Sequence, residues 1–179
     1  MTIITNYYTM DNKDGVDLNN VVATVNASTP EYPGLNAKLG DQVQGNGGSV
    51  WLYVQASTTV TALNVVAIDS DFKANNITAS IVASNRYTYG IALFNTTLAE
   101  AGQTFWACLK VAGGARINFA STAAAGAKVY VSGTAGMLTT GATTTIPQMV
   151  GVAFTTTISG ATTANEATLL SFMVPYVSV

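Results

Sequence analysis

Histidine is absent from this chain, cysteine occurs once, and charged residues make up only 9% of its 179 residues. Without histidine the commonest general base is missing, which excludes a Ser-His-Asp triad and any histidine-bound metal. One cysteine cannot form an intrachain disulfide, a zinc cluster or an iron–sulfur centre. These absences argue against most enzymes, and we predict neither a cofactor nor a metal site.

The shortage of charge does not come with the composition of a disordered chain. Hydrophobic residues make up 49% of the sequence and the net charge is only −2, whereas disorder pairs low hydrophobicity with high net charge. Soluble domains carry about 25% charged residues. The composition therefore predicts one folded domain or two very small ones, with a surface that is hidden in an assembly.

The same residues limit the partners that the chain can have. The sequence has no cluster of Lys and Arg and a pI of about 4.8, so we expect no binding to nucleic acid. Its first residues lack the basic and apolar regions of a secretory signal, and the long charge-free run over residues 129–165 is interrupted by glycines. We therefore expect no membrane association, and synthesis in a cytoplasm.

The first 48 residues differ from the rest and predict an extended N-terminal arm. Seven of the charged residues lie within residues 1–41, and no period of 2 or 3.6 is sustained there. Apolar residues occur in small isolated groups between Gly and Pro residues, which is typical of a segment that becomes ordered by lying on another surface. A partly ordered tail, or a first strand packed on its own domain, is the alternative.

The remaining sequence is typical of an all-β protein. Short runs of β-branched and aromatic residues alternate with Gly, Asn, Asp, Ser and Thr clusters, which indicates many short strands joined by turns in a sandwich or barrel. The predicted strands cover residues 50–54, 65–68, 77–83, 89–94, 105–111, 116–119, 128–131, 149–154 and 167–174.

An internal repeat divides these strands into two related β-barrel or sandwich-like units. Residues 89–98 resemble residues 150–158, and in both places a small-residue turn and a closing strand follow. Residues 63–68 correspond in the same way to residues 126–131. We therefore predict an arm over residues 1–48, a first unit over 49–112 and a second over 113–179, joined at Gly113-Gly114.

Few residues are candidates for chemistry. Asp69 and Asp71 are the only closely paired carboxylates after the arm, and they suit either a metal or acid–base site or, as favoured here, a polar turn. Cys108 has no histidine to activate it and is predicted to be a packed residue. The glycine-rich turn over residues 45–48 lacks the following Lys-Ser/Thr of a phosphate-binding loop.

Aromatic residues are the other candidates. Arg86, Tyr87 and Tyr89 could stack on a base or a sugar, although packing or a subunit contact is the more ordinary role for such a group. Trp51 and Trp106 fall in the first and last strands of the first unit, so we expect them to fill its core.

One segment carries a resemblance to a known family. Tyr89-Gly90-Ile91-Ala92-Leu93-Phe94, followed by Ala101-Gly102-Gln103-Thr104-Phe105-Trp106, resembles the decoration (cement or head-stabilising) proteins of tailed bacteriophages. The resemblance covers residues 40–111 best, and residues 115–179 only through the repeat. It implies a β-barrel protein without catalytic residues, an N-terminal arm lying on the major capsid protein, and a homo-oligomer, with a trimer favoured over a dimer.

The main hypothesis is therefore a non-enzymatic virion protein on the outer surface of an icosahedral phage head. It would stabilise contacts between subunits of the major capsid protein by adding buried area. The predicted capsid contacts are the apolar residues of the arm: Tyr7, Tyr8, Leu18, Val21, Val22, Tyr32 and Leu35. The alternatives are a fibre, spike or lectin-like module that binds a host glycan through Tyr87, Tyr89 and Trp51, and a trimeric β-enzyme such as a nucleotide hydrolase, for which the carboxylates are few and scattered.

Overall fold

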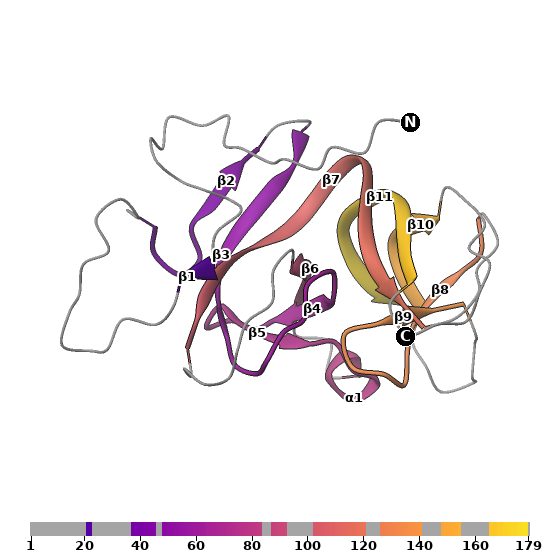
Figure 1. Ribbon diagram of the computed structural model, residues 1–179, viewed down its shortest axis with the longest axis horizontal. Coiled ribbons are helices and arrows are strands. Elements are labelled where there is room, and N and C mark those ends of the chain that lie inside the picture. Colours follow the sequence, from indigo (N-terminus) through magenta and orange to yellow (C-terminus); the bar gives the residue numbers. More distant parts are fainter. Residues whose placement is uncertain are drawn as a thin grey trace.

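The computed structural model describes residues 21–22, 37–45, 48–83, 87–92, 102–120, 126–140, 148–154 and 165–178. For residues 21–22, 111–116, 150–154 and 165–178 only the backbone is described. Strands dominate this part of the chain, with one four-residue helix (Figure 1), so the all-β prediction is confirmed.

The elements follow one another in the order β1 (Val21–Val22), β2 (Gln42–Gln44), β3 (Val50–Ala56), β4 (Val65–Ile68), β5 (Lys73–Asn76), α1 (Ala79–Val82), β6 (Thr88–Ala92), β7 (Thr104–Phe119), β8 (Val129–Val131), β9 (Leu138–Thr139), β10 (Gln148–Phe154) and β11 (Asn165–Ser178).

Five strands close into a first barrel. Strand β3 pairs with β7, β7 with β6, β6 with β4, β4 with β5, and β5 returns to β3. The β3–β5 pair is parallel and the other four pairs are antiparallel. Closure leaves no free edge within this ring, which removes the tendency of open sheet edges to pair with other chains.

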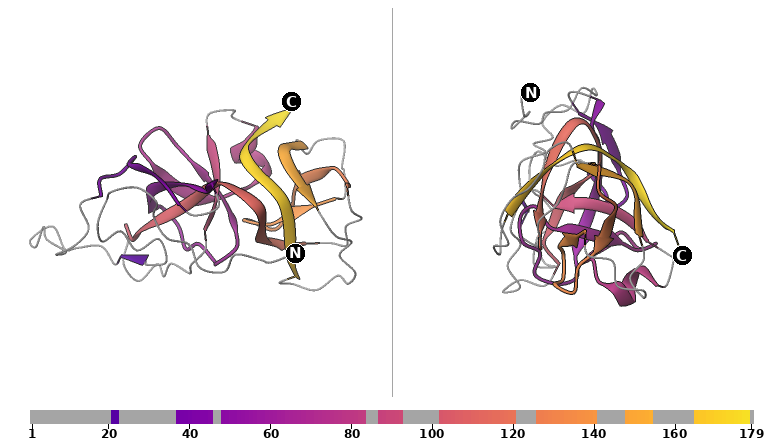
Figure 2. Two further views of the ribbon diagram at one scale, coloured as in Figure 1. Left: turned by 90° about the horizontal axis from the view of Figure 1, so that it is seen from above. Right: turned by 90° about the vertical axis from the view of Figure 1, so that its right-hand side faces the viewer.

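The remaining strands repeat this pattern with β7 as a shared member. Strand β7 pairs with β11, β11 with β10, β10 with β8, β8 with β9, and β9 returns to β7. Again the pair that closes the ring, β7–β9, is parallel and the others are antiparallel. The last strand of the first ring is thus the first strand of the second, and the two rings lie side by side along the long axis (Figure 2). The predicted relation between the two units is present in the pairing pattern.

The sheet formed by β3 and β7 is buried on both faces. Alternate residues of these strands point to opposite faces and belong to two different apolar clusters. Leu52, Val54, Phe105 and Ala107 belong to a cluster with members on all five strands of the first ring, which fills that barrel. Their neighbours, such as Trp51 and Trp106, belong to a second cluster on the outer face of the barrel that continues into β8, β9 and β10. The outer cluster therefore joins the two rings.

Strand β7 corrects the prediction of separate strands at 105–111 and 116–119. It runs through Gly113 and Gly114, where a joint between the units was expected. Its pairing with β11 shifts register there: Ser171 faces Ala112 and Leu169 faces Ala115, so β7 has one residue more than its partner. The two glycines thus lie at a β-bulge, a common position for glycine within strands.

The predicted strand over residues 77–83 is wrong, because this segment contains α1. Thr78 caps the helix: its backbone is extended and its Oγ1 accepts a hydrogen bond from the Ile81 N–H at 3.3 Å. Val82 is fully buried in the outer cluster. The β-branched residues of this segment suggested a buried strand, but one turn of helix buries Val82 equally well.

Part of the predicted arm belongs to this β-structure. Strand β2 pairs antiparallel with β3, and Val43 lies opposite Trp51 with only 1% of its surface exposed. Further upstream, β1 pairs antiparallel with the beginning of β7. The extent of the arm and the division into 1–48, 49–112 and 113–179 stay predictions.

Candidate functional site

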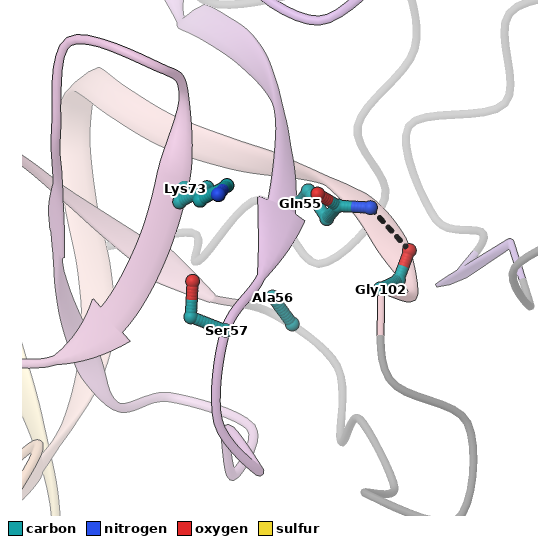
Figure 3. A pocket seen from close by; sticks show the side chains of 5 residues that line it. All are labelled: Gln55, Ala56, Ser57, Lys73 and Gly102. Carbon is teal, nitrogen blue, oxygen red and sulfur yellow. Dashed lines mark hydrogen bonds between the residues drawn. The ribbon is translucent and has the colours of Figure 1, made fainter.

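A pocket opens at the end of the first barrel where β3 ends and where β5 and β7 begin. It has a volume of about 310 Å³, and Figure 3 shows its lining, which consists of Gln55, Ala56, Ser57, Lys73 and Gly102. We call it the barrel-end pocket.

Backbone pairing brings these distant residues together. Gln55 is in register with Lys73 across the parallel β3–β5 pair, and the Ser57 N–H donates to the Ala74 carbonyl at 2.9 Å. On the β7 side the Gln55 side chain continues the ladder, because its Nε2 donates to the Gly102 carbonyl oxygen at 3.2 Å (Figure 3). The walls of the pocket are therefore set by strand register.

The pocket presents unpaired polar groups above an apolar floor. Lys73 and Ser57 are exposed, and no hydrogen bond or ion pair involves the Lys73 ammonium group or the Ser57 hydroxyl in the described part of the chain. The Lys73 side chain extends from β5 toward β3, and the Ser57 hydroxyl points into the same opening (Figure 3). Ala56 and Ala74 behind them belong to the buried barrel core.

Asp69 holds the turn from which Lys73 emerges. Its Oδ1 accepts the backbone N–H groups of Asp71 and Lys73, both at 2.9 Å. An Asp side chain that accepts N–H groups two and four residues later stabilises a turn. The turn role expected of this pair is confirmed for Asp69, while Asp71 is exposed.

Strand β1 lies at the same end of the barrel. Val22 is in register with Thr104 and Val21 with Phe105, at the beginning of β7. Thr104 faces Gln55 of the pocket on its other side. Of the seven predicted capsid contacts, Val21 and Val22 are thus placed by backbone pairing; the other five, Tyr7, Tyr8, Leu18, Tyr32 and Leu35, lie outside the described residues.

The aromatic residues considered for ligand stacking are used for packing. Trp51 is 0% exposed and Tyr89 3% exposed, and Tyr87 packs against the same core. Burial, followed by the neighbouring Tyr87, raises the pKa of the Tyr89 hydroxyl. Arg86 lies outside the described residues. The glycan-binding alternative needs these rings at the surface, so their burial counts against it.

The two tryptophans are buried, but they lie in the outer cluster that joins the two rings and not inside the first barrel, where they were expected. They differ in polar bonding. The Trp51 Nε1 donates to Ser49 Oγ at 2.9 Å. The Trp106 ring packs on Tyr53 with centroids 5.0 Å apart, and its buried Nε1 has no hydrogen-bond partner among the described residues. Trp106 therefore contributes only apolar and ring contacts.

Cys108 is a packed residue, as predicted. It is 1% exposed, its Sγ donates to the Lys110 carbonyl oxygen, and burial raises the pKa of its thiol to about 12. The thiolate needed for nucleophilic chemistry is thus disfavoured. Across the described ranges, no three His, Cys, Asp or Glu side chains gather as a metal site would require. No helix in those ranges has the length and apolarity to cross a membrane.

The sequence did not single out Gln55, Ser57 or Lys73. One signal was available, because Lys73 is among only nine charged residues after position 48. The convergence of residues 55–57, 73 and 102 depends on strand register, which no local pattern reveals.

Comparison with known proteins gives no match to a protein-family model, to a curated protein or to a solved structure.

Proposed function

We propose that this chain is a non-enzymatic structural protein of a tailed-phage virion. In this proposal it binds the outer surface of the icosahedral head and stabilises contacts between subunits of the major capsid protein. It acts as a homo-oligomer, a trimer or a dimer, and is made in the host cytoplasm before it joins the virion.

The observation that carries the proposal is the attachment of the N-terminal segment to the barrel body through β1. Pairing of Val21 and Val22 with the start of β7 fixes one point of this segment to the body. Twenty residues precede that point, among them Tyr7, Tyr8 and Leu18. Fully extended, they would reach at most about 70 Å from that point.

Three further features support a structural role over a ligand-binding one. Trp51, Tyr53, Tyr89, Phe105 and Trp106 are buried, so they strengthen the body instead of contacting a ligand. The two rings share one continuous strand, which suits a protein that carries load between attached surfaces. Few charges lie after position 48, so close contact with a partner desolvates few ions.

The test begins with virions of the phage whose genome encodes the chain. Mass spectrometry should detect its peptides in purified particles, and antibodies should label the outside of intact heads. Heads lacking the protein should bind the purified full-length chain in a sedimentation assay.

The arm is tested by the full-length triple variant Tyr7→Ala, Tyr8→Ala, Leu18→Ala. It should bind heads at least ten-fold more weakly while its thermal unfolding is unchanged, because these positions precede the body. The exposed Lys128→Gln serves as the matched control and should bind normally. Unimpaired binding of the triple variant would refute the arm mechanism, and hits on a glycan array together with absence from virions would favour the host-binding alternative.

A further inference from the structure

The barrel-end pocket contains an unpaired cation that the fold itself does not need. Lys73 is one of the few charged residues of the body, and its ammonium group has no carboxylate partner in the described part of the chain. Asp69, four residues earlier, uses one carboxylate oxygen to hold the turn. A lone lysine beside a free hydroxyl offers several hydrogen-bond donors to one opening.

The second ring supplies an internal comparison, because it closes in the same way with different side chains. The Ala120 N–H donates to the Leu138 carbonyl as the Ser57 N–H donates to the Ala74 carbonyl, both at 2.9 Å. By this correspondence Ala120 takes the place of Ser57.

The turns that lead into β5 and β9 also correspond. The Ser132 hydroxyl accepts the N–H two residues later, and the Ser132 N–H donates to the Met137 carbonyl. Asp69 does the same with Asp71 and with the Lys73 carbonyl. Met137 therefore takes the place of Lys73.

Closure of the first ring does not depend on the side chains of Lys73 and Ser57. A ring of this topology closes with Met137 and Ala120 at the two positions, so neither a charge nor a hydroxyl is required there. In the first ring these positions hold Lys73 and Ser57. They line a pocket of about 310 Å³ together with Gln55, whose side-chain nitrogen is bonded to Gly102. The polar groups of the pocket are thus free for a ligand.

We propose that the barrel-end pocket binds a carboxylate, presented by an acidic side chain of a protein partner. Lys73 supplies the charge and Ser57 a hydrogen bond, which is the charge-assisted pairing that carboxylates prefer. The Ala56 methyl group and the core behind it limit the access of water on one side. The partner is the capsid protein if the proposed function holds, and only that identity rests on the proposed function.

The test uses the isolated full-length chain and titrates it with small probes, followed by the amide shifts in ¹H–¹⁵N NMR spectra at constant ionic strength. The probes are N-acetyl-aspartate N-methylamide for a side-chain carboxylate, N-acetylglycine for a main-chain carboxylate, and the N-acetyl-asparagine amide as the uncharged control. Shifts at residues 55–57, 73 and 102 that rise toward saturation are expected for blocked aspartate. The dissociation constant should be roughly tens to hundreds of millimolar, because one exposed ion pair contributes little binding free energy.

Variants assign the effect to the pocket. Lys73→Gln should weaken binding of blocked aspartate at least ten-fold and Ser57→Ala about three-fold, whereas the exposed Lys128→Gln should leave it unchanged. Asp71→Asn removes a nearby negative charge without touching the lining and should tighten binding.

Three results would overturn the proposal: equal binding by Lys73→Gln and the unaltered chain, shifts of the same size with the asparagine control, or shifts located elsewhere. Stronger binding of N-acetylglycine would overturn the assignment to an acidic side chain. Because the titration needs no phage head, carboxylate binding by a chain that fails to bind heads refutes the proposed function alone. Head binding without carboxylate binding refutes the pocket alone.

Discussion

Replacing Gly136 with alanine should destabilise the protein far more than replacing other glycines of the second ring. Gly136 has a φ of +81°, and a Cβ added there would lie 2.2 Å from Asn64 Nδ2 and 2.5 Å from Asn64 Cγ. Asn64 cannot move freely, because its amide donates to Asn76 Oδ1 at 2.9 Å and its oxygen accepts from Asn118 Nδ2 at 2.8 Å.

The expected loss of stability is the sum of two costs, the left-handed backbone and the displacement of Asn64. A left-handed backbone costs a residue with a Cβ about 1 kcal/mol. Displacing the buried Asn64 side chain loses two hydrogen bonds, each contributing about 1 kcal/mol. We expect Gly136→Ala to lower the free energy of unfolding by about 3 kcal/mol.

Two other glycines separate the cost of the left-handed backbone from the cost of displacing Asn64. Gly126 has a φ of +76° with no atom within 4 Å of its added Cβ, so Gly126→Ala should cost only about 1 kcal/mol. Gly133 has neither a positive φ nor a close neighbour, and its replacement should change stability by less than about 0.5 kcal/mol. Urea unfolding followed by circular dichroism measures all three. If Gly136→Ala costs no more than Gly126→Ala, the contact with Asn64 contributes nothing and the reasoning fails.

Three further predictions concern single side chains. Trp51→Phe should cost about 1–2 kcal/mol more than Trp106→Phe, because only the first loses a hydrogen bond; equal costs in urea unfolding would contradict this. Asp69→Ala should lower stability by about 1–2 kcal/mol and Asp71→Ala by less than about 0.5 kcal/mol, since only Asp69 holds backbone N–H groups; the same assay compares them. Cys108, with a thiol pKa of about 12, should not react with a disulfide reagent at pH 8 until the chain unfolds. Because the unfolded thiol ionises near pH 8.5 and the folded thiol does not, stability should fall by up to about 1.4 kcal/mol per pH unit between pH 9 and 11, and less steeply in Cys108→Ala.

Local patterns were sufficient to predict most of the strands. The run 65–68 became β4 with the same bounds, because β-branched residues between turn signals leave little alternative. Alternation also placed Cys108 opposite Phe105 and Ala107, which enter the other core. The repeat was visible because equivalent strands carry similar apolar residues.

The errors arose where pairing partners decide the structure. Nothing local shows that Gly113 and Gly114 form a bulge, because the strand that supports them on one side, β11, lies about 55 residues further along the chain. The barrel-end pocket could not be predicted for the same reason: its lining comes from three strands and depends on their register. The residues predicted to contact a capsid depend on a partner, and their roles stay predictions.

Sharing β7 between the rings also has a consequence for the time course of synthesis. The first ring is complete in sequence once Phe119 has been made, but the outer half of β7 still awaits β11, which begins at Asn165. At the usual elongation rate those 46 residues take roughly 2–9 s. During that interval the edge of β7 that β11 later covers is still open. Gly113 and Gly114 lie in this edge, and glycine within a strand weakens its pairing with other chains.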